Sequence, residues 1–144
     1  MRRLAALIGE WSMAAEFPRA APTDVLGRTV FEWMQGERLV VQRWEVPDPA
    51  APDGVAIIGP AAGGDGYLQH YFDSRGVARV YEMSFSGGEW KLWRDSPDFS
   101  PLDFCQRFSA SFSEDGGRIA GSWERSGDGS SWQLDFNLAY TKVE

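Results

Sequence analysis

Apolar and polar residues alternate with a period of two along most of this chain, which is the pattern of half-buried β-strands. The alternation is clearest between residues 67 and 112. Turn residues such as Gly87-Gly88 and Asp128-Gly129 separate the segments. The expected strands span residues 10–17, 28–34, 38–46, 55–59, 67–73, 77–85, 89–95, 104–112, 117–126 and 131–142.

Helical spacing is found at the start of the chain, where Leu4, Leu7 and Ile8 recur as on one face of a helix. About ten short strands with tight turns and a single helical turn predict an all-β fold. We expect one domain over residues 1–144, an antiparallel up-and-down β-barrel of about 8–10 strands. A β-sandwich is the alternative.

The connections differ in character. Residues 18–26 are rich in Pro and Ala and are expected to form a loop. Residues 47–54 are the most loop-like segment and could form a flap over a barrel mouth, although loop-length statistics favour a plain surface connection. Gly63-Gly64-Asp65-Gly66 lacks the Lys and Ser/Thr of a phosphate-binding loop and precedes a strand, so no nucleotide site is expected.

The hairpin turns allow neighbouring strands to be aligned. Around residues 73–76, we expect His70 to oppose Arg79, and around Gly87-Gly88 we expect Tyr81 to oppose Arg94. Alternation then places these four polar side chains on the face that also carries most of the apolar residues, which should be the interior. A shift of one residue in the register would move them to the outside.

An interior Arg requires a carboxylate, a ligand anion or water, because a buried unpaired charge is costly. The pattern therefore favours a pocket with an apolar lining and a cationic patch made by His70, Arg79, Tyr81 and Arg94. The other interpretation is that both arginines pair with Asp or Glu at the end or surface of the barrel. The 28–46 hairpin adds three candidate ligand contacts, which are Glu32, Arg43 and Trp44. For Glu32 and Arg43, the simpler alternative is an ion pair that faces solvent.

Composition narrows the classes of function. Aromatic residues make up 14% of the chain, including seven Trp and nine Phe, enough to fill a wide core or line a cavity. The net charge of −7 opposes nucleic-acid binding. No stretch has the roughly 20 apolar residues of a membrane span, and the apolar start is short for a signal peptide, so we expect a cytoplasmic protein without a membrane partner.

Few residues are available for chemistry. His70 is the only histidine and Cys105 the only cysteine, so we expect no disulfide, no metal cluster and no catalytic constellation. Cys105 has the opposite phase to Phe104 and Phe108, and we interpret it as a small filler.

With these strands in place, the sequence resembles the lipocalin-like (calycin) superfamily. It is most similar to a bacterial family of unknown function that is distantly similar to nitrobindin-type proteins. The resemblance rests on Gly9-Glu10-Trp11 at the first strand, on residues 69–77 and 121–124, and on a last strand, 132–140, that would close on the first. It implies a barrel that holds one small ligand.

The chain departs from that pattern at two positions. Lipocalins cover the tryptophan with an arginine near the last strand, and here Lys142 is available instead. Nitrobindins bind haem through a histidine near the C-terminus, and residues 121–144 contain none. No cofactor is therefore expected.

We expect a barrel that binds a partly apolar molecule with an anionic or carbonyl group. An enzyme with His70 as acid or base is the first alternative. Two further alternatives are haem binding through His70 and a module that binds a partner protein. The sequence is also compatible with a homodimer.

Overall fold

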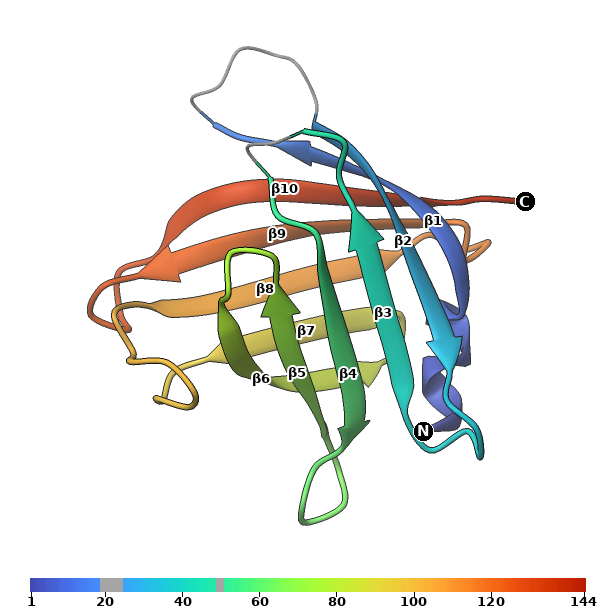
Figure 1. Cartoon of the computed structure of the whole chain (residues 1–144), viewed down its shortest axis with the longest axis horizontal. Coiled ribbons are helices and arrows are strands. Elements are labelled where there is room, and N and C mark those ends of the chain that lie inside the picture. Colours follow the sequence, from blue (N-terminus) through green and yellow to red (C-terminus); the bar gives the residue numbers. More distant parts are fainter. Residues whose placement is uncertain (19–24, 49–50) are drawn as a thin grey trace.

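The computed structural model describes residues 1–18, 25–48 and 51–144, and its strands form a closed antiparallel barrel (Figure 1). Each strand pairs with its neighbours in sequence, and β1 also pairs with β10. The prediction of an up-and-down barrel with an N-terminal helical turn is confirmed. The elements are η1 (Arg2–Leu7), β1 (Gly9–Glu16), β2 (Val25–Trp33), β3 (Val40–Glu45), β4 (Gly54–Pro60), β5 (Tyr67–Asp73), β6 (Ala78–Ser86), β7 (Glu89–Arg94), β8 (Cys105–Phe112), β9 (Arg118–Ser126) and β10 (Gln133–Lys142).

The barrel is flattened into two crossing layers. In Figure 1, β2 to β5 run from top to bottom in front of β7 to β10, which run from side to side. Strands that twist and tilt strongly enough to close a barrel cross in this way. Side chains from the two layers therefore meet in the interior.

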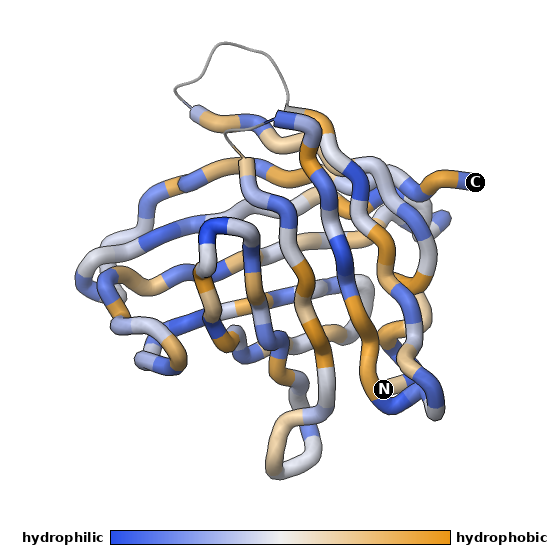
Figure 2. The backbone as a smooth tube through the Cα atoms, in the orientation of Figure 1, coloured by the Kyte–Doolittle hydropathy of each residue, from blue (hydrophilic) through white to orange (hydrophobic). Residues whose placement is uncertain are grey.

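Alternating hydropathy along the strands determines which side chains meet there, as the changing colours of the tube in Figure 2 show. Side chains one residue apart project to opposite faces of a strand. The buried set is mainly aromatic and aliphatic, and its largest apolar members, each 1% exposed or less, are Trp11, Trp90, Phe31, Phe108, Leu4, Leu7, Ile58, Met83, Ile119 and Val40.

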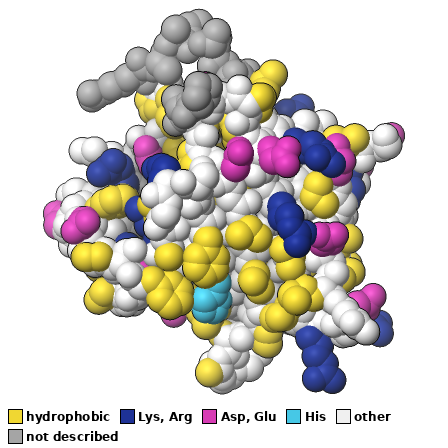
Figure 3. Space-filling model, in the orientation of Figure 1, with side chains coloured by type: hydrophobic (Ala, Val, Ile, Leu, Met, Phe, Trp, Pro, Cys, Tyr) yellow, Lys and Arg dark blue, Asp and Glu magenta, His cyan; other side chains and the backbone are white. Residues whose placement is uncertain are grey.

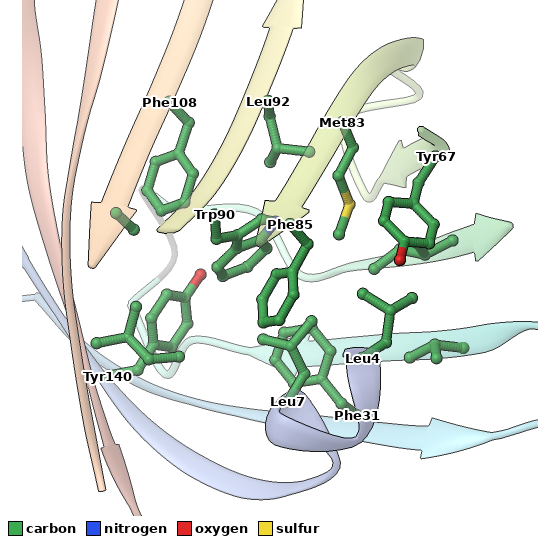
Figure 4. Close-up of a cluster of buried hydrophobic side chains, with 14 of the residues drawn as sticks. Leu4, Leu7, Phe31, Tyr67, Met83, Phe85, Trp90, Leu92, Phe108 and Tyr140 are labelled. Carbon is green, nitrogen blue, oxygen red and sulfur yellow. The ribbon is translucent and has the colours of Figure 1, made fainter. Parts of the chain in front are cut away.

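Helix η1 covers one end of the barrel, which we call the closed end. Leu4 and Leu7 are fully buried and point into a cluster that includes Phe31 and Phe85 (Figure 4). The indole Nε1 of Trp11 donates to the carbonyl of Leu7 at 2.8 Å, which ties the helix to β1.

The first and last strands meet at Trp11, which pairs with Lys142. The Lys142 ammonium lies 4.7 Å from the centre of the Trp11 ring, a cation–π contact. It thus covers the tryptophan from the last strand, where the resemblance implies an arginine. Gly9 adopts a φ of 131°, which residues with a side chain rarely adopt, and the Lys142 side chain lies close to it.

Two predictions about the strands are wrong. Strand β2 begins at Val25 and not at residue 28, so the end of the expected 18–26 loop belongs to the sheet; residues 19–24 of that loop lie outside the described part of the chain. In the β5–β6 hairpin, Phe72 pairs with Ala78 and His70 with Val80, one residue later than expected.

The turn itself explains the shift in register. Gly76 adopts a φ of 83° and its N–H donates to the carbonyl of Asp73, while the Asp73 N–H donates to the carbonyl of Val77. This geometry adds one residue to the connection, as a glycine bulge does after a type I turn. Because the side-chain period is two, one extra residue turns all of β5 over relative to β6.

Candidate ligand-binding site

At the end of the barrel opposite η1, which we call the far end, several interior-facing side chains are partly exposed. They are Trp44, Tyr71, Arg79 and Trp123. Comparable positions at the closed end are almost fully buried. Solvent therefore reaches these side chains at the far end.

The far end has an aromatic wall. The rings of Trp44 and Tyr71 stack at 5.3 Å between centroids, and Tyr71 meets Tyr81 edge to face at 5.9 Å. Tyr81 in turn lies 5.4 Å from Trp123. Gly54 makes the wall possible, since an added Cβ would lie only 2.2 Å from the Trp44 ring.

A polar group lies beside this wall. The Tyr81 hydroxyl donates to Oε1 of Gln106 at 2.9 Å, and Nη1 of Arg79 donates to the same oxygen at 3.2 Å. Burial raises the pKa of the Tyr81 hydroxyl, so it stays protonated and acts as a donor at neutral pH. Two strands thus meet at one amide oxygen, which Gln106 of β8 supplies and to which Arg79 and Tyr81 of β6 donate.

Arg79 and Arg125 flank the Phe104 ring, at 5.6 and 4.5 Å from its centre. Neither guanidinium forms an ion pair within the described residues, although five other arginines do. Arg79 is partly buried and Arg125 is exposed. The far end therefore presents two cations without a carboxylate partner in a protein of net charge −7.

Arg94 lies inward at the same end but is neutralised by the protein. It forms an ion pair with Asp98 through two hydrogen bonds of 2.8 and 3.0 Å, and its side chain is 2% exposed. Nη2 also donates to the carbonyls of Ser100 and Pro101. The interpretation that this arginine pairs with an aspartate is confirmed, and its donors are used to hold residues 98–101.

His70 lies on the outer face, so the prediction that it faces the interior is wrong. The shifted register places Gln69 inside, at 4% exposure, and turns His70 outward. Its ring lies 6.3 Å from that of Phe99, which also stacks on Phe72. Figure 3 shows the histidine on the surface among hydrophobic side chains. His70 therefore does not share a site with Arg79, Tyr81 and Arg94.

The 28–46 hairpin divides its candidate residues between the two faces. Arg43 forms an ion pair with Glu32, and both side chains are more than half exposed on the outer face. Glu124 likewise pairs with Arg107. Trp44 faces the interior, and its Nε1 donates to the carbonyl of Pro52 at 3.2 Å.

Sequence reasoning missed the interior polar residues Thr29, Gln42, Gln69 and Gln106, which are all less than 10% exposed. The expected register placed Gln69 on the outer face, because it alternates with His70. The phase of these residues relative to apolar neighbours would have placed two of them, because Gln42 lies midway between Val40 and Trp44, and Gln106 lies two residues before Phe108. The same argument from Trp123 would have found Arg125.

Two surface hollows lie near the far end. One, of about 390 Å³, is lined by residues of the β9–β10 hairpin and includes Arg125. The other, of about 290 Å³, lies on the outer face between β5, β6 and residues 93–98. The first contains one basic residue, Arg125, and one acidic residue, Asp128.

The described residues contain no group of three or more His, Cys, Asp and Glu side chains arranged to hold a metal ion. None of the described helices is both long and apolar enough to cross a membrane. The far-end groups described above are aromatic rings, a tyrosine hydroxyl, an amide and guanidinium groups.

These observations define the protein as an antiparallel ten-stranded β-barrel over its described residues. Its fold is similar to that in the crystal structure of Rv2717c from M. tuberculosis, with a TM-score of 0.68 over 99% of this chain and 96% of that chain. The two sequences are 14% identical, so the likeness shows the fold alone. No protein-family model and no curated protein matches the sequence.

Proposed function

We propose that the barrel binds a small, partly apolar molecule at its far end, with an anionic or carbonyl group directed to Arg79. The carrying observation is that Arg79 faces inward, is partly buried and donates to the neutral amide of Gln106. None of the ion pairs among the described residues includes Arg79. A partly desolvated guanidinium without a counter-charge favours an anion strongly.

The residues around Arg79 favour a ligand with an apolar part at one end and a polar or anionic group at the other. Trp44, Tyr71 and Trp123 supply aromatic surface for an apolar part, and burial of that surface contributes affinity. Arg125 adds a second positive charge at the rim. The donor hydroxyl of Tyr81 orients a polar group of the ligand if it leaves Gln106.

A matched pair of fluorescent probes tests this function. 8-Anilinonaphthalene-1-sulfonate and N-phenyl-1-naphthylamine share the same ring system, and only the first carries an anion. We expect the sulfonate to bind more tightly to the wild-type protein. Arg79→Gln should weaken sulfonate binding about tenfold, as expected for the loss of one charge-assisted hydrogen bond, and leave the neutral probe within about twofold.

The control is Arg43→Gln, which removes the same charge from the outer face, where Arg43 pairs with Glu32. It should change the affinity for either probe less than twofold. Equal losses in both variants would show that net charge alone attracts the sulfonate. Loss of both probes in Arg79→Gln, with unfolding excluded by circular dichroism, would contradict the assigned role of the guanidinium.

Two alternative functions, catalysis by His70 and haem binding through His70, require that His70 face the interior, and it faces outward. An acid or base must reach the substrate that Tyr81 or Arg79 holds, and His70 projects from the opposite face of the barrel wall. The same orientation turns it away from any haem in the interior. A His70→Ala variant should bind the sulfonate probe with wild-type affinity, and a loss would reopen those alternatives.

A further inference from the structure

Trp90 carries a buried polar atom without a partner. It lies in β7, is 1% exposed, and its Nε1 is the only buried side-chain nitrogen or oxygen of the described residues that lacks a hydrogen bond. A buried N–H donor left unpaired is costly, and native proteins satisfy nearly all such groups. This donor therefore indicates an acceptor that the protein itself does not supply.

Other indoles of the same barrel are satisfied by the chain. Nε1 of Trp11 donates to the carbonyl of Leu7 at 2.8 Å, and Nε1 of Trp44 donates to the carbonyl of Pro52 at 3.2 Å. Trp11 is fully buried, like Trp90. Burial alone therefore does not prevent an indole of this protein from finding an acceptor.

The surroundings of Trp90 combine aromatic rings with a polar neighbour. The rings of Phe31 and Phe108 meet it edge to face, at 6.0 and 5.1 Å. The Tyr140 ring lies 6.0 Å away, and Figure 4 shows its hydroxyl turned toward Trp90. Burial raises the pKa of that hydroxyl and outweighs the hydrogen bond with Gln42, which lowers it. Tyr140 therefore stays protonated.

Tyr140 interacts with Gln42, which belongs to a row of hydrogen-bonded interior side chains. Gln69 donates through Nε2 to Oε1 of Gln42 at 3.4 Å, and Gln42 donates through Nε2 to the hydroxyl of Thr29 at 3.2 Å. Thr29 ends the row by donating to the carbonyl of Arg43 at 3.0 Å. A buried oxygen needs two to four polar partners, and Nε1 of Trp90 and the hydroxyl of Tyr140 supply two of them.

We propose that the barrel interior contains a binding position for one oxygen acceptor, held by Nε1 of Trp90 next to the Tyr140 hydroxyl. The acceptor is a water molecule in the ligand-free protein, or the carbonyl oxygen of a small molecule that displaces it. The position lies in the core and does not include Arg79, so it stands or falls independently of the proposed far-end function.

Nuclear magnetic resonance of ¹⁵N-tryptophan-labelled wild-type protein tests the proposal. Trp90→Phe identifies the Trp90 indole signal by its loss, and backbone connectivities identify it if that variant does not fold. The Trp11 indole is the reference for a buried hydrogen-bonded donor. We expect the Trp90 indole proton at the downfield position of the reference, with cross-relaxation to water in the free protein.

Cyclopentanone distinguishes the two sources of the oxygen, with cyclopentane as the control that lacks it. Cross-relaxation from cyclopentanone to the Trp90 indole proton, with loss of the water signal, shows an organic carbonyl at the position. Retention of the water signal shows water alone, which also supports the acceptor position. An upfield indole proton with neither signal places the N–H over a ring and overturns the proposal.

Discussion

The two ends of the barrel are built from the same kinds of residue but differ in what covers them. At the closed end, η1 seals aromatic rings that are almost fully buried, such as Phe31 and Trp90. At the far end, Trp44 and Trp123 remain partly exposed next to guanidinium groups. Aromatic content alone therefore does not distinguish a filled core from a ligand site. The neighbouring polar groups make that distinction.

The largest effect is expected for a ring at the closed end. Phe31→Ala should lower the free energy of unfolding by about 3–5 kcal/mol, because it removes a 1% exposed ring and leaves a cavity. Phe99→Ala is the control, since that ring is 62% exposed and its loss should cost about 0.5 kcal/mol or less. Urea denaturation measures both. Equal effects would contradict the description of the closed end as the packed core.

The next effect concerns the buried ion pair at the far end. Asp98→Asn should cost about 3 kcal/mol, because the Arg94 charge would stay buried without a counter-charge. Hydrogen bonds from Arg94 hold the pKa of the Asp98 carboxyl well below its usual range. The ion pair therefore stabilises the fold fully above the unfolded-state pKa of about 3.9, and this stability is lost as the pH falls below that value.

Stability measured against pH checks the assignment. The pH range from about 5 to about 2 brackets the unfolded-state pKa of about 3.9. Over this range the free energy of unfolding should fall more for the wild-type protein than for Asp98→Asn. Parallel curves for the two proteins would show that Asp98 does not carry this dependence.

A moderate effect is expected at the aromatic wall. Gly54→Ala places a Cβ within 2.2 Å of the Trp44 ring and should cost about 1–3 kcal/mol through overpacking. The near-ultraviolet circular dichroism of the Trp44–Tyr71 stack should change as well. Gly127→Ala is the control, since an added Cβ there meets nothing within 4 Å. An unchanged spectrum in Gly54→Ala would contradict the close contact.

The smallest effect is expected on the outer face. Arg43→Gln breaks an ion pair with Glu32 that is more than half exposed, and such pairs contribute about 0–1 kcal/mol. Thermal unfolding at low and high salt measures the difference, which should shrink as salt screens the charges. A loss as large as that of Asp98→Asn would show that outer-face charges matter as much as the buried pair.

The strands and their order were predictable because alternation and turn residues are local signals. Side-chain orientation within a hairpin was less predictable, because it depends on the number of residues in the turn. At Gly87-Gly88 the predicted register is confirmed, because Phe85 pairs with Trp90 and this alignment sets Tyr81 opposite Arg94. At Gly76 a single extra residue reversed β5 and moved His70 outside.

The polar residues of the candidate site show a second limit. Arg94 and Asp98 are four residues apart, yet their pairing depends on the path of the loop that follows β7. Gln106 is brought to Arg79 and Tyr81 by the closed barrel, since these residues are at least 25 positions apart in sequence. Alternation could place each of them on a face, but it could not tell which of them meet.

The most direct test of the account is to locate the sulfonate probe in the barrel. Indole signals of ¹⁵N-tryptophan-labelled protein would be followed while 8-anilinonaphthalene-1-sulfonate is added. The account predicts that Trp44 and Trp123 at the far end shift, while Trp11 under η1 does not. Shifts confined to Trp93, which lines the outer-face hollow, would place the probe outside the barrel and contradict the account.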